Sequence, residues 1–150
     1  MHVREALAAE AELLSELAIQ SKAYWGYSEE FIESCKDVLT IDTPYIVENH
    51  VYVLEEKLKI VGFFSFERRK GDTLDFLYIH PDFIGRQFGS ELWESVLHKA
   101  RELGIKSFTI DSDPNAKGFY EKMGAKQVGK TPSTVFRDRL LPLMKYVVED

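Results

Sequence analysis

Thr73-Leu-Asp-Phe-Leu-Tyr-Ile-His-Pro81 runs directly into Asp82-Phe-Ile-Gly85-Arg-Gln-Phe-Gly89-Ser-Glu-Leu-Trp93. The first segment has the pattern of an apolar strand, and the second that of a glycine-bearing turn opening an amphipathic helix. A strand that enters a helix through such a turn presents backbone N–H groups to an anion, and the helix dipole adds to the attraction. The pattern therefore predicts an anion site around residues 84–90.

The glycine spacing narrows what that anion site can be. No Gly-Lys-Ser/Thr follows, so the segment is not a Walker A loop, and its two glycines are spaced wrongly for a dinucleotide-binding fingerprint. An ordinary strand-to-helix turn would also account for two glycines four residues apart. The choice between these interpretations depends on the rest of the chain.

Composition limits the class of protein. The 150 residues suit one domain, residues 1–150, and an apolar content of 45% predicts a globular core. A net charge of −6 without a basic face argues against nucleic-acid binding. The sequence shows no leader-like segment and no apolar stretch long enough to span a membrane. Because Cys35 is the single cysteine, no internal disulfide can form, and we expect a soluble cytoplasmic protein.

Hydrophobic periodicity predicts the elements around the opening stretch. The run 60–66 is almost continuously apolar, which predicts a sheet covered on both faces. Ser28, followed by two glutamates, is a predicted helix N-cap. Together the patterns predict an α/β (α+β) fold with a mixed, mostly antiparallel central sheet of about 6–7 strands and helices on both faces. The expected strands are 2–5, 50–55, 59–67, 73–79, 105–110, 125–128 and 140–148; the expected helices are 8–20, 28–38, 88–104 and 115–123, with a short turn or helical piece from residue 43.

Two motifs in this order resemble the GCN5-related N-acetyltransferase (GNAT) family. The family signature, Gln/Arg-x-x-Gly-x-Gly/Ala, follows a strand that ends in an apolar-x-Pro step, which Ile79-His-Pro81 supplies. Gly89 matches the final small position, and Gly85 and Arg86 match residues common inside the motif. Ile84 and Gln87 depart from the signature, at the Gln/Arg position and the first glycine position.

The second motif is Asp113-Pro-Asn115-Ala-Lys-Gly-Phe-Tyr120-Glu-Lys-Met-Gly124. It is similar to the family segment Asn-Ala-x-x-Phe-Tyr-x-x-x-Gly. The resemblance implies that Asn115 contacts the pantetheine or phosphate arm of the coenzyme and that Tyr120 protonates the departing thiolate. Taken alone, Asn115 could instead cap a short helix, and Tyr120 could be a core aromatic residue.

The resemblance implies an acyl-CoA N-acyltransferase-like fold and acetyl transfer from acetyl-coenzyme A, as co-substrate, to a primary amine by direct attack. The sheet is then splayed between strands 73–79 and 105–111, and the N–H of Ile79 binds the thioester oxygen. No metal is implied. The acceptor is a small-molecule amine or a protein amine, and a homodimer is compatible with the fold. The coenzyme-binding residues implied are Leu77, Tyr78, Ile79, Ile84, Gly85, Arg86, Gln87, Phe88, Gly89, Ser90, Asn115, Lys117 and Tyr120.

The general base and the acceptor site are predicted from residue chemistry. Strand alternation places Asp75 on the same face as Leu77 and Ile79, which makes Asp75 the preferred base. Glu67, Asp111, Asp113 and His80 are the competing candidates. The aromatic residues Tyr24, Trp25 and Tyr27 are predicted to line the acceptor site, or else to pack over the sheet. Arg137 and Arg139 could contact an acidic substrate group, or be solvated.

Two other functions remain open at this point. One is a noncatalytic acyl-coenzyme A binding or sensing module on the same fold, which the departures at Ile84 and Gln87 favour and the retained Tyr120 argues against. The other is a cysteine hydrolase that uses Cys35 with His50, His80 or His98. Cys35 lies in a predicted helix without an oxyanion turn, which argues against the hydrolase.

Overall fold

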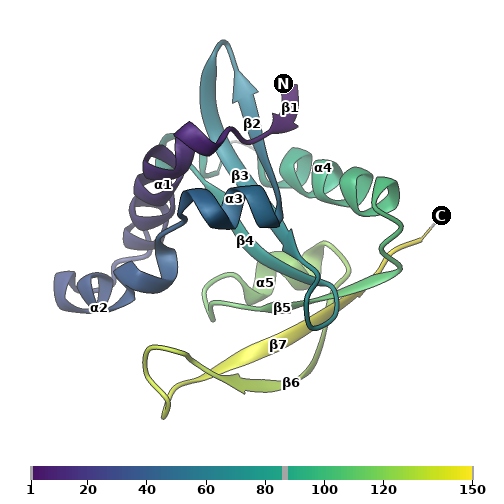
Figure 1. Ribbon diagram of the computed structural model, residues 1–150. Helices are drawn as coiled ribbons and strands as arrows, with labels where there is room; N and C mark the ends of the chain where they lie inside the picture. Colours follow the sequence, from purple (N-terminus) through teal and green to yellow (C-terminus); the bar gives the residue numbers. More distant parts are fainter. Residues whose placement is uncertain (1, 86–87, 150) are drawn as a thin grey trace.

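The computed structural model describes residues 2–85 and 88–149, so Arg86 and Gln87 lie outside the described residues. Its elements follow the predicted order (Figure 1). The strands are β1 (His2–Glu5), β2 (His50–Glu56), β3 (Lys59–Glu67), β4 (Thr73–Ile79), β5 (Ser107–Asp111), β6 (Lys126–Pro132) and β7 (Leu140–Val147). The helices are α1 (Ala11–Ala23), α2 (Glu29–Leu39), α3 (Thr43–Glu48), α4 (Phe88–Glu102) and α5 (Lys117–Lys122), with short 3-10 turns at Ala8–Glu10 and Pro81–Phe83.

The strands form one seven-stranded sheet in the order β1-β2-β3-β4-β5-β7-β6. Every neighbouring pair is antiparallel except β4 and β5, which are parallel. This arrangement confirms the predicted mixed, mostly antiparallel sheet. No helix in the described part of the chain is long and apolar enough to cross a membrane.

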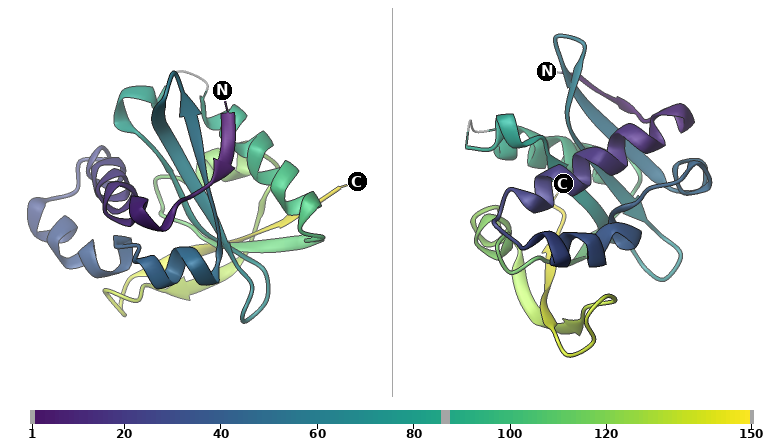
Figure 2. Two further views of the ribbon diagram at one scale, coloured as in Figure 1. Left: turned by 45° about the horizontal axis from the view of Figure 1, so that its top comes forward. Right: turned by 90° about the vertical axis from the view of Figure 1, so that its left-hand side faces the viewer.

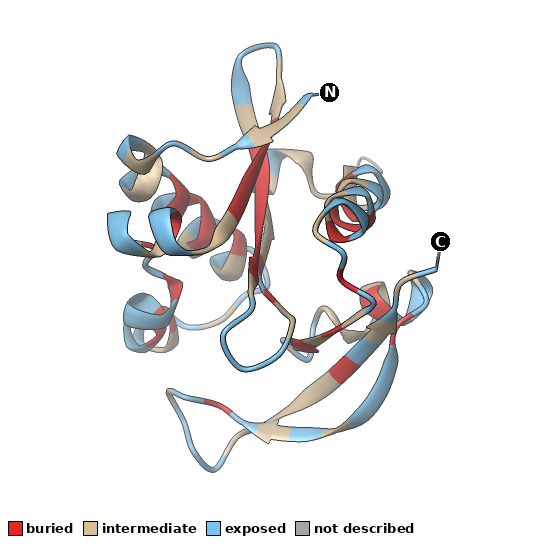
Figure 3. Ribbon diagram, turned by 45° about the vertical axis from the view of Figure 1, so that its right-hand side comes forward, coloured by how far each residue is buried: buried red, intermediate tan, exposed pale blue. Residues whose placement is uncertain are grey.

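Helices cover both faces of the sheet, as the apolar run in β3 predicted. Helices α1–α3 lie against one face and α4 against the other (Figure 2). Successive β3 residues therefore enter different cores: Phe63 packs with α1–α3, and Phe64 packs with α4. Both side chains are fully buried, and the buried surface is concentrated in the central strands and the helix sides that face them (Figure 3).

Local signals located most element ends. Ser28 is the N-cap of α2, because its hydroxyl accepts a hydrogen bond from the Phe31 N–H at 3.1 Å. Several boundaries differ from expectation. Helix α1 covers Ala11–Ala23 rather than 8–20, because residues Ala8–Glu10 form a 3-10 turn before it, and β5 begins at Ser107 rather than at residue 105. Helix α5 is shorter than 115–123, and β6 continues to Pro132 rather than ending at Val128. Strand β6 continues because its pairing with β7 resumes after an irregularity at Gln127/Gly129. The segment Gly-Lys-Thr-Pro has no strand pattern of its own, so this extension depends on pairing with β7.

Candidate active site

Strands β4 and β5 separate almost as soon as they meet. Their ladder consists of one residue pair, Thr73 with Thr109, whereas β3 and β4 pair along the whole length of β4. Beyond Thr73 the facing edges of β4 and β5 are therefore unpaired. The sheet is splayed between these central strands, as predicted.

The open edge of β4 carries two backbone amides. The N–H of His80 donates to the carbonyl of Val61, so the alternating antiparallel ladder turns residues 78 and 80 toward β3. The same alternation turns the amides of Leu77 and Ile79 away from β3, into the gap. These two N–H groups therefore line the gap as donors without a strand partner.

A bulge in β4 reverses one side-chain direction. Pairing with β3 shifts between Ser65 and Phe66, so one residue of β4 has no opposite partner. As a result Leu74 and Leu77, which alternation would place on opposite faces, both pack into the core under α4. Asp75 turns to the other face, where its carboxylate accepts a hydrogen bond from the Tyr45 hydroxyl. The expectation that Asp75 shares a face with Leu77 and Ile79 was therefore wrong, because the bulge interrupts the alternation.

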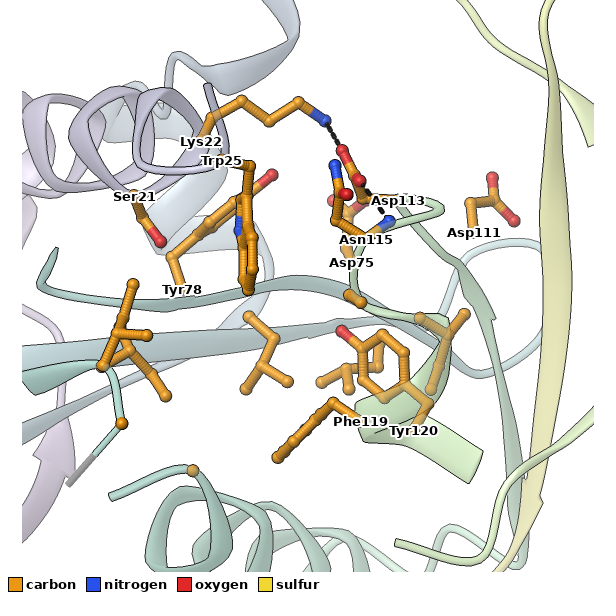
Figure 4. Close-up of a pocket in the computed structure, with 18 residues that line it drawn as sticks. Ser21, Lys22, Trp25, Asp75, Tyr78, Asp111, Asp113, Asn115, Phe119 and Tyr120 are labelled. Atoms are coloured by element: carbon orange, nitrogen blue, oxygen red, sulfur yellow. Dashed lines mark hydrogen bonds and ion pairs between the residues drawn. The ribbon is translucent and has the colours of Figure 1, made fainter. Parts of the chain in front are cut away.

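A cleft of about 260 Å³ fills the gap between β4 and β5 (Figure 4). Helix α1 bounds it on one side, and α5 with the turn before α4 on the other. Predicted site residues that line it are Trp25, Asp75, Leu77, Tyr78, Ile79, Ile84, Gly85, Gly89, Asn115 and Tyr120.

Other predicted site residues lie elsewhere. Tyr24 is half exposed and packs edge-on against Trp25. Phe88 packs against Phe83, and neither Ser90 nor Lys117 is among the lining residues. The predicted coenzyme-binding residues Arg86 and Gln87 lie outside the described residues.

Tyr120 reaches the cleft from α5. The residue is 6% exposed, and its hydroxyl has no hydrogen-bond partner among the described residues (Figure 4). Burial, followed by the nearby charge of Asp113, raises the pKa of Tyr120, so the phenol stays protonated at neutral pH. It is therefore a hydrogen-bond donor presented to the cleft.

The glycines of the turn are required for different reasons. Gly85 has φ +83°, a left-handed backbone conformation that residues other than glycine adopt only at a cost in conformational energy. Gly89 stands against α5, since a Cβ there would lie 2.9 Å from Cε1 of Phe119. The start of α4 thus packs directly on the helix that carries Tyr120.

A hydrogen-bonded network around Asp113 closes the outer end of the cleft. Asp113 is paired with Lys22 of α1 and accepts from the Tyr27 hydroxyl at 2.9 Å. The same hydroxyl accepts hydrogen bonds from Asn115 Nδ2 at 2.9 Å and from Arg139 Nη2 at 3.0 Å. Tyr27 and Asn115 therefore link the walls of the cleft. The side-chain amide of Asn115, which was expected to contact the coenzyme, is hydrogen-bonded to Tyr27.

The candidate bases differ in environment. Burial acts to raise the pKa of Asp113, but the hydrogen bond and charge of Lys22 hold it below its usual value. Partial desolvation by the surrounding protein raises the pKa of Asp75, against the lowering effect of the Tyr45 hydrogen bond, and it also raises that of Asp111, although both residues keep exposed surface. Asp75 and Asp111 are thus the better proton acceptors. His80 accepts from the Asp82 N–H and does not line this cleft.

A second cleft, of about 430 Å³, adjoins the first. It lies between α2, the middle of β4 and the loop between β6 and β7. Lining side chains shared by the two clefts are Lys22, Asp75, Tyr78, Asp111 and Asp113. A molecule in the second cleft can therefore reach a group held between β4 and β5.

Cys35 lines the second cleft but is 4% exposed, and burial raises the pKa of its thiol. His50, His80 and His98 are not among the residues that line this cleft. Without a histidine beside it, a protonated thiol is a poor nucleophile, so the arrangement argues against the cysteine hydrolase.

Sequence reasoning missed the roles of Lys22, Tyr45 and Phe119. Lys22 stands 91 residues from Asp113 in the chain, and Tyr45 stands 30 residues from Asp75. No local pattern announces such pairs. Phe119 was placed in a motif, but its packing on Gly89 follows only from the fold.

Comparison with known proteins agrees with this geometry. A family model described as an acetyltransferase (GNAT) domain matches residues 15–141. A solved GCN5-related N-acetyltransferase from Rhodopseudomonas palustris superposes with a TM-score of 0.79 at 24% identity, covering 97% of this chain and 94% of that chain. The PaiA N-acetyltransferase of Thermoplasma acidophilum, solved in complex with coenzyme A, gives a TM-score of 0.76 at 20% identity, covering 97% and 98%.

A curated relative, the uncharacterised N-acetyltransferase ycf52 of Gracilaria tenuistipitata var. liui, is 28% identical over 91 residues. The match covers 57% of this chain and 48% of that protein, so it spans about half the relative's length. The family model covers most of the chain, and the solved structures show the same fold. The chain therefore belongs to the GNAT acetyltransferase family.

Proposed function

We propose that this GNAT acetyltransferase transfers the acetyl group of acetyl-coenzyme A to a primary amine by direct attack. The observation that carries the proposal is the gap between β4 and β5. In it the Leu77 and Ile79 amides on the open edge of β4 face one cleft together with the Tyr120 hydroxyl, which has no hydrogen-bond partner among the described residues, and a second cleft adjoins the first.

The chain has the groups that an acyl-coenzyme A molecule requires. The open edge of β4 offers backbone pairing to the amide-containing pantetheine arm. The turn at Gly85 and the start of α4 offer backbone N–H groups to phosphate. The Ile79 N–H is placed to bind the thioester oxygen, where negative charge develops during attack.

Asp75 and Tyr120 carry out different proton transfers around the thioester. Asp75, directly or through a water molecule, takes one proton from the ammonium form of the acceptor, and the free amine then attacks the carbonyl carbon. The Ile79 N–H stabilises the oxygen while the new C–N bond forms. As the C–S bond breaks, Tyr120 donates a hydrogen bond and then its proton to sulfur, and it regains a proton from the nitrogen. The products are the acetamide and the free thiol, with one proton released to solvent.

Binding and turnover test the proposal separately. Calorimetry with acetyl-coenzyme A, coenzyme A and ATP measures the donor site, since ATP lacks the arm that pairs with β4. A panel of primary amines, followed by thiol release, measures transfer. We expect binding selective for the coenzymes and thiol release that depends on the amine. No binding of acetyl-coenzyme A would refute the donor site.

A noncatalytic acyl-coenzyme A sensor is the second candidate, favoured by Ile84 and Gln87 at positions where the family motif has other residues. It predicts tight coenzyme binding without thiol release for any amine in the panel. The same two measurements therefore separate the candidates.

A further inference from the structure

The charges that line the second cleft are of both signs and lie on different walls. Asp75 of β4 and Asp111 at the end of β5 form an acidic wall, shared with the donor cleft. Lys22 of α1 and Arg139 before β7 form a basic wall. If the proposed function holds, this cleft receives the amine acceptor, and its charges select among amines.

The acidic wall is open to a cation. Neither Asp75 nor Asp111 forms an ion pair with a lysine or arginine among residues 2–85 and 88–149, and Asp75 accepts only the neutral Tyr45 hydroxyl. Both carboxylates line the second cleft as well as the donor cleft, so one bound cation can meet the two of them. An ammonium group at this wall would lie at the boundary with the donor cleft, where attack on the thioester takes place.

The basic wall keeps one positive charge without a direct counter-ion. Lys22 is neutralised by Asp113, whereas Arg139 makes no ion pair with any described residue. Its guanidinium lies 5.0 Å from the ring centroid of Phe31 and 5.6 Å from that of Tyr27, and it donates one hydrogen bond to the Tyr27 hydroxyl. The aromatic rings fix the plane of the guanidinium and leave its remaining N–H donors available, the arrangement that suits a carboxylate.

Polar and apolar side chains share the rest of the lining: Thr40, Ser133 and Thr134 are polar, and Val38, Leu39, Phe76, Val135 and Leu141 are apolar. A cleft whose lining carries unpaired charges of both signs matches a zwitterion. We infer that the acceptor is a free amino acid, whose ammonium meets Asp75 and Asp111 and whose carboxylate meets Arg139. A diamine would leave Arg139 without an anion, and a peptide N-terminus would present a neutral amide to it.

Matched acceptors test this inference. Leucine, leucinamide and isoamylamine share one side chain and differ only in carrying a carboxylate, an amide or hydrogen, and putrescine represents the diamines. Thiol release is measured for each, with kcat/KM expressed per concentration of free amine. We expect leucine to exceed leucinamide and isoamylamine by at least about tenfold, the size expected of a hydrogen bond to a charged group. A preference for leucinamide, isoamylamine or putrescine would overturn the inference.

Substitutions of two arginines test whether Arg139 causes the preference for leucine. Arg139→Gln should lower the leucine-to-isoamylamine ratio of kcat/KM by about tenfold. Arg137→Gln is the matched control, because Arg137 is exposed and does not line the cleft. Equal effects of both variants on the ratio would overturn the assignment of Arg139.

Binding provides a readout that does not need turnover. With coenzyme A present, calorimetry compares N-acetyl-leucine with N-isoamylacetamide, which differ by the carboxylate. Preferential binding of N-acetyl-leucine, lost in Arg139→Gln, supports the inference even if no amine is acetylated, in which case only the proposed function fails. Equal binding of the two compounds would overturn the inference while leaving amine acetylation intact.

Discussion

The Tyr45 hydroxyl donates a hydrogen bond to the carboxylate of Asp75 at the bulge in β4. Ser65 completes the link, because its hydroxyl bonds Tyr45 at 2.9 Å and also accepts the Phe76 N–H at 3.2 Å. Ser65, which accepts a backbone hydrogen bond at the bulge, is thus linked through Tyr45 to Asp75, whose carboxylate the bulge directs to the other face of the sheet. Helix α3, which carries Tyr45, thereby fixes the direction of the proposed base.

The pH dependence of kcat/KM should report on this contact. Transfer requires ionised Asp75, so activity falls as pH drops through its pKa, which burial raises above the ordinary aspartate value of about 3.9. The Tyr45 hydrogen bond lowers that pKa, and the charges of Glu67 and Asp111 raise it. Tyr45→Phe should therefore move the acidic limb of the profile to higher pH, and Asp111→Asn should move it to lower pH. Unchanged limbs in both variants would exclude Asp75 as the titrating base.

Tyr120→Phe removes the hydroxyl in the donor cleft with little change in packing. If Tyr120 assists the departing sulfur, kcat should fall by about 10²-fold, and the affinity for coenzyme A, from calorimetry, should stay within about twofold. Circular dichroism and thermal unfolding serve as controls for the fold. Full activity in this variant would remove Tyr120 from the mechanism.

Gly89→Ala should destabilise the protein through α5. The added Cβ would lie 2.9 Å from Phe119, whose ring packs edge-on against Trp93 and Tyr120 and has little room to yield. We expect a loss of about 1–3 kcal/mol in the free energy of unfolding, measured by urea titration.

Gly118→Ala is the matched control for that experiment. A Cβ at Gly118 would have no neighbour within 4 Å, and this glycine does not have a positive φ. The substitution should therefore stabilise the protein by about 0.4–1 kcal/mol, because alanine restricts the unfolded chain more than glycine does. Equal effects of the two substitutions would show that contact with Phe119 does not constrain Gly89.

The ion pair between Lys22 and Asp113 should make the free energy of unfolding depend on pH in the acid range. Because the pKa of Asp113 is lowered in the folded state, its contribution is present above about pH 3.9 and is lost as pH falls through the folded-state pKa. Asp113→Asn should cost on the order of 2 kcal/mol at pH 7. Between pH 5 and pH 2 the variant should then lose less stability than the parent chain, as urea titrations at each pH would show. Parallel curves for the two proteins would mean that Asp113 has an ordinary pKa when folded.

The sequence by itself determined the elements, their order and the two-sided sheet. Apolar runs such as 60–66, helical stripes and the cap at Ser28 are local signals, and each acts within a few residues of the structure it specifies. The turn at Gly85 was recognisable for the same reason, since its positive φ is a property of one residue.

Only the tertiary structure decided how the site is arranged. The face of Asp75 depends on a bulge set by pairing with β3, and alternation along β4 alone gave the wrong answer. Lys22, Asp113, Tyr27 and Arg139 are bonded across 86 to 112 residues of chain. Arg137 and Arg139 are two residues apart in the sequence, but the fold places Arg139 in the lining of the second cleft and leaves Arg137 exposed to solvent. Contacts of this kind form when distant segments pack, so no local pattern of residues encodes them.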